Sequence, residues 1–494
     1  MNVLLINPKF DRYTRTLCTP LGLLSIATYL ETHGHKVKML NRAAKSTDIC
    51  KEFDDFKPDM IGCSFLSPMP LKDAVVVSEE AKKRGIFVIW GGPFVSSVPE
   101  LCFTLGCLDV ISFGEGEETI LELAESLQAG KEWRNIKGIG YMQDGKFVKT
   151  EEREFLDLSK LPPINYEYID DFEPLLYTNY NYDGLFGMYL SKGCTQNCTF
   201  CYNRDFHHGC RRQRPVEVLI EEAKYLKEKH GIKAISFTDE LFGGNKKNLQ
   251  YICRAMIEAD LGLYWGCMTR IGIFDEEDFQ LMYDAGCRWI EFGVESGSRS
   301  ELARMKKGLN PDRVPVDLKI CKKIGIITLC YFIVGFPDQT EDELKETCAL
   351  MNSIDFTRFI CSYYNPLAGS EIFDKLVAEG RFTPPAKIED YMKTKIFYSP
   401  KPNLSKVSTK DLKVVRCRML WKSFTKKYYA EDEKRSYATA RKDIIDALEA
   451  LTGHGLKQGL QQFFITGYEF LDIFFYANFF PKTMKKYGLN PKKK

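Results

Sequence analysis

The chain has 494 residues, of which 44% are hydrophobic and 28% are charged, and its formal net charge is +2. This length exceeds one ordinary hydrophobic core, so we expect two or three domains of a soluble globular protein. The near-neutral charge gives no long-range field that would favour nucleic acid as a partner. The 17 cysteines lack the pattern of a secreted disulfide scaffold and the first residues predict a strand, so we expect a cytoplasmic location.

Residues 1–145 alternate short apolar runs with helical patterns. The apolar runs predict buried strands at 3–6, 37–40, 60–64, 88–90 and 110–113. The helical patterns fall at 21–33, 44–56, 71–84, 97–105 and 117–128. This alternation predicts an α/β domain with a parallel, doubly wound sheet of the flavodoxin-like type, whose ligand loops follow the carboxyl ends of the strands.

These loops carry no G-x-G-x-x-G dinucleotide motif. They resemble those of the cobalamin-binding domain, whose pattern is D-x-H-x-x-G, then S-x-L, then G-G. The glycines of the G-G part of the pattern let the backbone approach a flat, bulky ligand. Thr19 stands where the pattern has its histidine, so no imidazole of the protein would bind cobalt. The resemblance implies cobalamin contacts from Thr19, Ser64, Leu66, Gly91, Gly92, Pro93, Gly114, Glu115 and Gly116.

Two other interpretations of this domain remain open. It can be a degenerate flavodoxin-like domain that binds no cofactor. It can also hold a second cluster for methylthiotransfer, with thiolates from Cys18, Cys63 and either Cys102 or Cys107. The expected G-C-x-x-N context and an RNA-binding barrel are not evident, and buried apolar cysteines are the commoner explanation.

Residues 146–185 lack a sustained period and predict a linker between domains. A stretch with C-x3-C-x2-C spacing follows, formed by Cys194, Cys198 and Cys201. A structural zinc site closes with four protein ligands, whereas three thiolates can hold three irons of a 4Fe-4S cluster and leave the fourth iron open. A zinc knuckle and chance spacing are the alternatives.

With Phe200 immediately before the third cysteine, this stretch resembles the radical S-adenosylmethionine superfamily. The resemblance implies that the open iron chelates the amino and carboxylate groups of S-adenosylmethionine. An electron from the cluster then cleaves that molecule to methionine and a 5′-deoxyadenosyl radical.

Strand and helix patterns resume from 186 to 375 and resemble the partial (β/α)6 TIM-type barrel of radical enzymes, whose active site lies at the carboxyl ends of the strands. The strands are expected to end at Gly193, Asp239, Arg270, Glu295, Gly335 and near Tyr363, and the helices to span 215–230, 246–260, 275–286, 299–306, 312–324 and 341–352.

The same resemblance assigns roles to residues at these strand ends. Asp239 and Glu240 would meet the methionyl amino group, because a carboxylate accepts hydrogen bonds from an ammonium. Arg270 would pair with the methionyl carboxylate, Glu295 would contact the ribose or the methionyl end, and Gly335 would let the backbone approach the adenine. A helix cap, a structural ion pair and a turn are the alternatives.

Basic and imidazole side chains follow the cluster motif. Arg212 and Arg214 either line a cleft between domains or form a solvated basic turn. His207 and His208 are adjacent, and we expect surface pairing or packing for them.

The C-terminal residues 376–494 predict a helical region, with helices at 409–429, 435–451 and 456–480 before a lysine-rich tail. The last helix is very aromatic. It fits either contact with a membrane surface, where it would reach a lipid substrate, or a core helix over the barrel mouth, which we favour. No uncharged apolar run reaches the roughly 18 residues that span a bilayer.

The two resemblances together indicate a cobalamin-dependent radical S-adenosylmethionine enzyme of the class B methyltransferase type. By family analogy it is a C-methyltransferase at an unactivated carbon: one S-adenosylmethionine methylates cobalamin, a second yields the radical, and the substrate radical collects the methyl group. The implied cofactors are a 4Fe-4S cluster, S-adenosylmethionine and cobalamin. The implied partners are a reductant such as flavodoxin or ferredoxin and an unidentified organic substrate.

Other functions fit the same motifs. A cobalamin-dependent cyclase or oxidase would use both cofactors without methyl transfer, and the methylthiotransferase would use a second cluster. Outside enzymes, the chain would be a metal or redox sensor. No catalytic acid or base is evident in the sequence.

Overall fold

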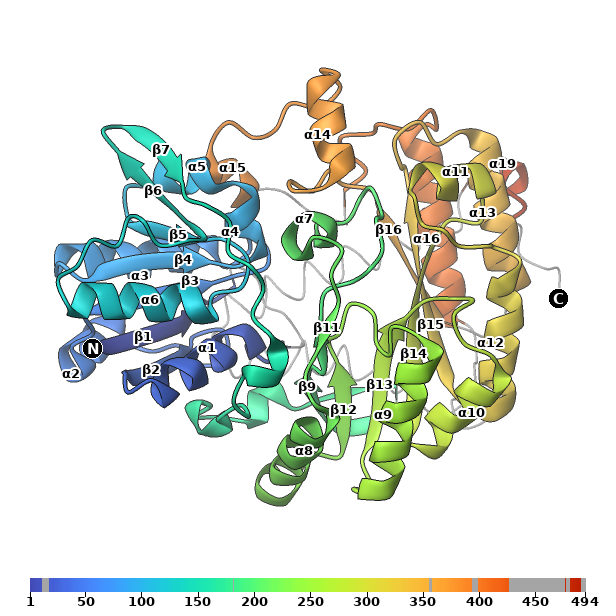
Figure 1. The fold of residues 1–494 in the computed structure, drawn as a ribbon. Coiled ribbons are helices and arrows are strands. Elements are labelled where there is room, and N and C mark those ends of the chain that lie inside the picture. The colour runs from blue at the N-terminus through green and yellow to red at the C-terminus, as the bar shows by residue number, and fades with distance from the viewer. Residues whose placement is uncertain are drawn as a thin grey trace, which may run out of the picture. The chain divides into compact units, whose positions relative to one another are not determined.

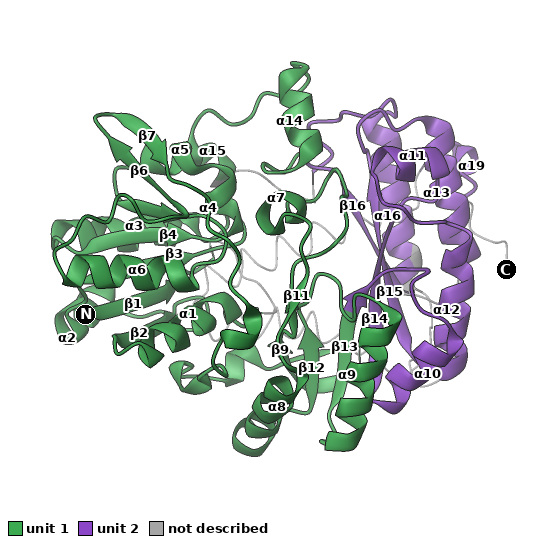
Figure 2. Cartoon of the chain, viewed as in Figure 1, with its two compact units in different colours: residues 1–267, 366–394 green, residues 268–365, 395–494 purple. Residues whose placement is uncertain are grey.

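The structure is a computed structural model that describes residues 1–10, 17–180, 182–354, 358–392, 399–425, 476 and 480–489. The chain forms two compact units (Figure 2). Unit 1 contains Met1–Cys267 and Pro366–Thr394, and unit 2 contains Met268–Asn365 and Lys395–Lys494.

Unit 1 begins with a sheet of order β2-β1-β3-β4-β5-β6-β7 (Figure 1). Its first five strands are parallel: β1 (Asn2–Asn7), β2 (Lys36–Asn41), β3 (Met60–Ser64), β4 (Phe87–Gly91) and β5 (Val110–Ser112). The order 2-1-3-4-5 is that of the flavodoxin-like doubly wound fold. The prediction of this fold is therefore confirmed.

An antiparallel hairpin that the sequence analysis missed extends this sheet. It consists of β6 (Ile139–Gln143) and β7 (Lys146–Lys149). Its two-residue turn, Asp144-Gly145, has φ values of 51° and 76°, as a tight hairpin turn requires. The Asp-Gly pair was therefore a usable signal, and β7 lies in the stretch predicted as a linker.

Four helices of this domain lie where the periodicity predicts them: α1 (Leu21–Thr32), α2 (Ile49–Phe56), α3 (Leu71–Lys83) and α6 (Glu117–Gln128). The helix α2 begins later than predicted because Asp48 caps it, accepting bonds from the N–H groups of Cys50 and Lys51. The helix predicted at 97–105 is present as the shorter α5 (Pro99–Phe103), and a separate short helix that was not predicted, α4 (Pro93–Ser97), precedes it. Each begins at a proline, because proline favours the first position of a helix and not its interior.

The rest of unit 1 contains the first strands of the second sheet. The strand β12 (Ala234–Phe237) pairs in parallel with β9 (Tyr182–Met188) and β13 (Tyr264–Thr269), and β8 (Tyr177–Asn179) is antiparallel to β9. The helices α8 (Val216–His230) and α9 (Lys246–Ala259) agree with the prediction. The first strand ends at Met188, before the predicted Gly193, and the chain then enters a short ribbon of β10 (Ser191–Lys192) and β11 (Arg212–Gln213).

The predicted linker also contains short 3-10 helices, η1 (Leu158–Lys160), η2 (Tyr166–Tyr168) and η3 (Glu173–Leu175). Three further α-helices of unit 1 were not predicted: α7 (Asn203–His207), α14 (Glu371–Ala378) and α15 (Ile388–Met392).

Unit 2 contains three parallel strands, β14 (Cys287–Glu295), β15 (Ile327–Val334) and β16 (Arg358–Tyr363). Its helices are α10 (Glu276–Asp284), α11 (Arg299–Arg304), α12 (Arg313–Ile324), α13 (Glu341–Ser353), α16 (Thr409–Thr425) and α19 (Pro481–Lys486). Reciprocal capping boxes begin α10 and α13. The strand and helix alternation predicted for the barrel is confirmed.

The predicted helices at 435–451 and 456–480, with most of the lysine-rich tail, lie outside the described residues. Within the described ranges, no helix combines the length and the apolar character that crossing a membrane requires.

Candidate active site

The three motif cysteines lie on the loop between β10 and α7 in unit 1. Cys198 is buried, and Cys194 and Cys201 are half-buried. The N–H of Cys201 donates to the carbonyl of Cys198 at 3.2 Å, so a turn that contains the half-buried Phe200 closes the motif. Gly193, directly before the loop, has φ +85°, and a Cβ there would collide with the carbonyl oxygen of Cys210. The loop therefore requires glycine at its start.

Two carboxylates at the end of β12 fix the backbone that leads into this loop. Asp239 is fully buried and accepts bonds from the N–H groups of Leu190 at 3.0 Å and Ser191 at 2.6 Å, and from the Ser191 hydroxyl. Glu240 accepts the Gly193 N–H at 3.0 Å, and its carboxylate lies 3.6 Å from Nε2 of His207. Both predicted S-adenosylmethionine residues thus support the cluster loop, and their contact with the methionyl amino group stays a prediction.

Burial and hydrogen bonding shift these two carboxyls in opposite directions. Burial raises the pKa of Asp239 to about 6, although the bonds from Ser191 and Leu190 oppose the rise. Burial alone would also raise the pKa of Glu240, but its contacts with His207 and the backbone outweigh burial and lower it. Glu240 is therefore the more firmly ionised of the pair.

The chemistry of the donor set fits a 4Fe-4S cluster. The loop carries three thiols, and two carboxylates hold its start. Three thiols suit a cluster in which the fourth iron has no protein ligand and is open to S-adenosylmethionine. Across the described ranges, no three His, Cys, Asp or Glu side chains stand together in metal-binding geometry. The assignment of Cys194, Cys198 and Cys201 therefore rests on their spacing and on the loop that carries them.

In unit 2, Lys307 joins the two predicted residues Arg270 and Glu295. The carboxylate of Glu295, which ends β14 with φ +68°, lies 2.7 Å from the ammonium of Lys307. The Arg270 guanidinium donates to the Lys307 carbonyl, and its buried Nε has no hydrogen-bond partner among the described residues. One donor of Arg270 is thus left for a ligand such as a carboxylate. Sequence reasoning missed Lys307, because no local pattern links it to the strand ends.

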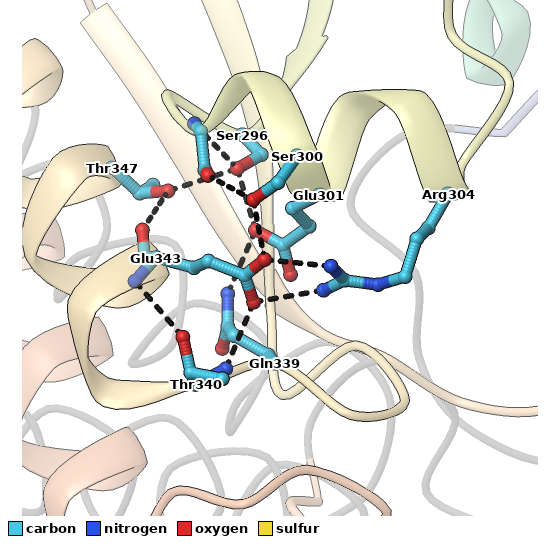
Figure 3. Close-up of polar contacts among 9 residues, drawn as sticks. Ser296, Ser300, Glu301, Arg304, Gln339, Thr340, Glu343 and Thr347 are labelled. Carbon is cyan, nitrogen blue, oxygen red and sulfur yellow. Dashed lines mark hydrogen bonds and ion pairs between the residues drawn. The ribbon is translucent and has the colours of Figure 1, made fainter.

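The backbone at Gly335 is tied to the end of β14 by three buried hydrogen bonds. Gly335 has φ +80°, and its N–H donates to Oε1 of Gln339 at 2.8 Å. The Gln339 amide donates to Oε2 of Glu301 at 3.0 Å, and the Ser296 hydroxyl donates to the same oxygen at 2.5 Å (Figure 3). Gln339, Glu301 and Ser296 are fully buried. The positions predicted for ribose and adenine, Glu295 and Gly335, are therefore linked through side chains that the sequence did not reveal.

A second carboxylate of this network, Glu343, is surrounded by hydrogen-bond donors that stabilise its ionised form, unlike Glu301. It accepts two bonds from Arg304, at 2.6 and 2.8 Å, and one from the Ser300 hydroxyl at 2.6 Å (Figure 3). Burial acts to raise its pKa, but these bonds and the N–H of Thr340 lower it to about 2. Burial raises the pKa of Glu301 to about 7, and its bonds with Ser296 and Gln339 only partly offset the rise.

We expect the unmodified protein to lose stability as pH rises through 7, and the variant Glu301→Gln to be free of this loss. Because burial raises the Glu301 pKa from 4.5 to about 7, its contribution to stability is full below about pH 4.5 and is lost as pH rises through 7. Glutamine keeps the acceptor and carries no charge, so the variant should be more stable at pH 8 by up to about 3 kcal/mol. Thermal unfolding between pH 5 and 8 measures the difference.

The matched control is Glu343→Gln in the same network. The lowered Glu343 pKa means that its ionised form stabilises the fold above pH 4.5. This variant should therefore be less stable at neutral pH. An identical pH dependence in Glu301→Gln and the unmodified protein would contradict the assigned environment of Glu301.

At the carboxyl edge of the first sheet, glycines bring the ends of β3 and β4 together. Gly92 follows β4 with φ +98°, and a Cβ there would lie 2.7 Å from the Phe65 carbonyl oxygen and 3.0 Å from Oγ of Ser64. Leu66 is 65% exposed beside this contact. Gly91 ends β4 and Pro93 begins α4. We name Ser64, Phe65, Gly91 and Gly92 the glycine cradle; it fits a flat ligand that needs close backbone approach.

The other predicted cobalamin residues lie on two further loops of unit 1. Thr19 packs against Gly187 of β9: a Cβ built at Gly187 would lie 3.0 Å from the Thr19 hydroxyl. Gly114 has φ +65° with open space around it, and Gly116 caps α6 against Ile26 of α1. The Glu115 carboxylate accepts two bonds from Arg212, at 2.6 and 2.9 Å. The structure therefore gives Glu115 a protein partner.

The solvated basic turn considered for Arg212 and Arg214 is wrong. The Arg212 side chain is 17% exposed and pairs with Glu115, and the Arg214 side chain is 2% exposed and pairs with Glu222. His207 is buried beside Glu240, whereas His208 is exposed. Both arginines are thus structural cations.

The cysteines considered for a second cluster mostly belong to the hydrophobic core. Cys63, Cys102 and Cys107 pack in the cluster of buried residues under the first sheet, and Cys18 is exposed. Burial raises the pKa of Cys102 and Cys107 to about 12. These thiols behave as apolar side chains, which supports packing over a second metal centre.

Two family models match the chain, the Radical SAM superfamily at residues 188–351 and the B12 binding domain at residues 13–124. An uncharacterised methyltransferase of Pyrococcus horikoshii is 32% identical over 392 residues, which cover 76% of this chain and 83% of that relative. An anaerobic magnesium-protoporphyrin IX monomethyl ester cyclase of Rubrivivax gelatinosus is 25% identical, over 76% of this chain and 70% of that relative.

Among solved structures, the radical S-adenosylmethionine methyltransferase TsrM from Kitasatospora setae, with cobalamin and a [4Fe-4S] cluster bound, has the same fold. Its TM-score is 0.67 at 19% identity, over 79% of this chain and 84% of TsrM. The chain belongs to the radical S-adenosylmethionine superfamily, in the group of enzymes with an N-terminal B12-binding domain. Its cofactors are a 4Fe-4S cluster, S-adenosylmethionine and cobalamin.

Proposed function

We propose that this enzyme is a C-methyltransferase that places a methyl group on an unactivated carbon of an organic substrate. The observation that carries the proposal is that unit 1 contains both the glycine cradle and the cysteine loop. The relative of Pyrococcus horikoshii, which is named a methyltransferase, supports it.

The residues of the chain would divide the work by position. When bound, the cluster supplies the electron that cleaves S-adenosylmethionine, and cobalamin supplies the methyl group. Asp239 and Glu240 hold the backbone before Cys194. Arg270 and Glu295, joined by Lys307, would bind the methionyl and ribose ends of S-adenosylmethionine.

A cavity in unit 1 offers room for the substrate. Its volume is about 430 Å³, and Gly114 and Glu117 line it together with Tyr202 and Phe206, which follow the third cysteine. This volume suits a small organic molecule. We infer that the substrate approaches here, between the predicted cobalamin loop and the helix after the cluster motif.

Cyclisation or oxidation without methyl transfer is the second candidate. The Rubrivivax gelatinosus relative, named a cyclase, favours it. Such an enzyme would form 5′-deoxyadenosine and no S-adenosylhomocysteine.

Product analysis separates the two candidates. We expect anaerobic enzyme with both cofactors, a reductant and methyl-deuterated S-adenosylmethionine to form equal amounts of S-adenosylhomocysteine and 5′-deoxyadenosine when fractions of a metabolite extract contain the substrate. Mass spectrometry should show one labelled methyl group in the product. Formation of 5′-deoxyadenosine alone, with an unlabelled product, would refute methylation and establish the second candidate.

We further propose that flavodoxin or ferredoxin supplies the electron and that the enzyme acts in the cytoplasm. The helix considered either for membrane contact or for the core over the barrel mouth falls on residues 456–480, nearly all of which lie outside the described residues.

A further inference from the structure

The short ribbon before the cluster loop carries two cations side by side. In the antiparallel pair of β10 and β11, Lys192 lies directly opposite Arg212. Like charges in opposite positions of a ribbon repel each other. Lys192 immediately precedes Gly193 and Cys194, so the position of this ribbon decides where the first predicted cluster ligand lies.

Two carboxylates on the loop after β5 and at the start of α6, Glu115 and Glu117, neutralise these cations. The ammonium of Lys192 lies 2.8 Å from Glu117 and 3.9 Å from Glu115, and Arg212 donates two bonds to Glu115 at 2.6 and 2.9 Å. The Ser25 hydroxyl of α1 also donates to Glu117 at 2.7 Å. All four charged side chains are at most 18% exposed.

Glu117 stays ionised in this arrangement. Burial, the largest influence on it, would raise its pKa, but the charge of Lys192 and the hydrogen bonds from Lys192, Ser25 and the backbone together outweigh burial and lower the pKa.

The carboxylates are rigidly placed in the N-terminal domain. Glu115 and Glu117 flank Gly116, the cap of α6, where the helix dipole favours negative charge. A Cβ at Gly116 would lie 3.0 Å from Ile26 of α1 and 3.3 Å from Ile120. This loop follows β5, the neighbour of β4 in the sheet that carries the glycine cradle. The carboxylates therefore cannot move without the framework of the predicted cobalamin site.

We propose that Lys192, Arg212, Glu115 and Glu117 form an ionic clamp that sets the distance between cobalamin and the iron–sulfur cluster. A buried charge is tolerated only when it is paired, so a shift of the ribbon along α6 would leave a cation or a carboxylate unpaired. The clamp thus selects one position of the cluster loop relative to the glycine cradle. Its members are positioning residues, and their effect on methyl transfer rests on the proposed function.

The decisive measurement is the magnetic interaction between cob(II)alamin and the reduced cluster, detected by electron paramagnetic resonance of the holoenzyme. We expect Lys192→Met to weaken or alter this interaction while both cofactors stay bound. Lys192→Arg, which keeps the cation, should restore it toward that of the unmodified protein. The double variant Lys192→Met/Glu117→Met removes both charges of this pair, so that neither residue is left as a buried charge without its partner. It should alter the magnetic interaction in the same way as Lys192→Met.

The control is Arg214→Met, which breaks the buried pair with Glu222 of α8 without touching the first domain. It should leave the magnetic interaction unchanged. An unchanged interaction in the cofactor-loaded double variant would overturn the clamp, as would an equal change in Arg214→Met.

Product analysis reports the consequence separately. If methylation is the reaction, Lys192→Met should lower methylated product about 10- to 100-fold, as expected for a small misplacement, with a smaller loss of 5′-deoxyadenosine. If neither the unmodified protein nor any variant yields methylated product, the proposed function fails. The magnetic measurement still shows whether the clamp sets the distance between the two cofactors.

Discussion

Replacing Cys198 by alanine is expected to abolish the reductive cleavage of S-adenosylmethionine. Cys198 is the middle cysteine of the motif, and its carbonyl accepts the Cys201 N–H in the turn that closes the loop. Alanine leaves two thiolates, which cannot hold three irons of a cluster with one open site. Formation of 5′-deoxyadenosine under reducing conditions should therefore fall to the uncatalysed background. Iron content and the visible spectrum measure the loss of the cluster directly.

Cobalamin retention should survive this substitution, because the glycine cradle belongs to a separate part of unit 1. The matched control is Cys210→Ala, which removes an exposed thiol outside the motif. It is the carbonyl of Cys210, not its thiol, that faces Gly193, so this variant should keep the cluster and the cleavage. Cleavage retained in Cys198→Ala would show that the cluster is held by other residues.

Periodicity and strand-end chemistry were sufficient to predict the framework of both sheets. Buried parallel strands appear as short apolar runs and amphipathic helices repeat every three to four residues, so β1 to β5 and α8 to α13 were located closely. Glu295 and Gly335 were singled out because each stands at the end of such a strand, where the family resemblance assigns a role; their contacts with S-adenosylmethionine stay predictions. Local exceptions were missed, such as the short helix α4 (Pro93–Ser97), which begins at a proline directly after β4.

Residues that act through long-range contacts could not be predicted from the sequence. Lys307 becomes part of the site only because the chain returns to Glu295, and Gln339 only because it reaches back to Glu301. Arg212 was noticed as a cation, but its partner Glu115 lies 97 positions earlier. Asp239 and Glu240 were singled out by their position after a strand, whereas their bonds to the backbone before the cluster loop could be seen only in the fold.

These missed contacts have a common physical character. Each pairs a buried polar or charged group with another that is distant in sequence, and no local window shows that the two will meet. Because a buried polar group is costly unless it is satisfied, such contacts determine how the loops of the site are placed. The sequence thus predicts which cofactors the chain uses better than it predicts how the chain positions them.

Replacing Gly92 by alanine should release cobalamin. At φ +98° a side chain is strained, which costs about 1–3 kcal/mol. Its Cβ would also lie 2.7 Å from the Phe65 carbonyl oxygen and 3.0 Å from Oγ of Ser64, so the ends of β3 and β4 must separate. We expect the dissociation constant of cobalamin to rise at least about 10-fold, equivalent to roughly 1.4 kcal/mol. Cobalt content after gel filtration and equilibrium titration measure it, and iron content should not change.

Gly34→Ala is the matched control, because it has a similar backbone strain without the clash. Gly34 lies after α1 with φ +83°, and no atom stands within 4 Å of a Cβ built there. This variant should lose stability by about 1–2 kcal/mol and keep its affinity for cobalamin, because the cradle is untouched. If Gly34→Ala releases cobalamin as readily as Gly92→Ala, general destabilisation explains the loss. Cobalamin held firmly by folded Gly92→Ala would show that the ligand binds away from the glycine cradle.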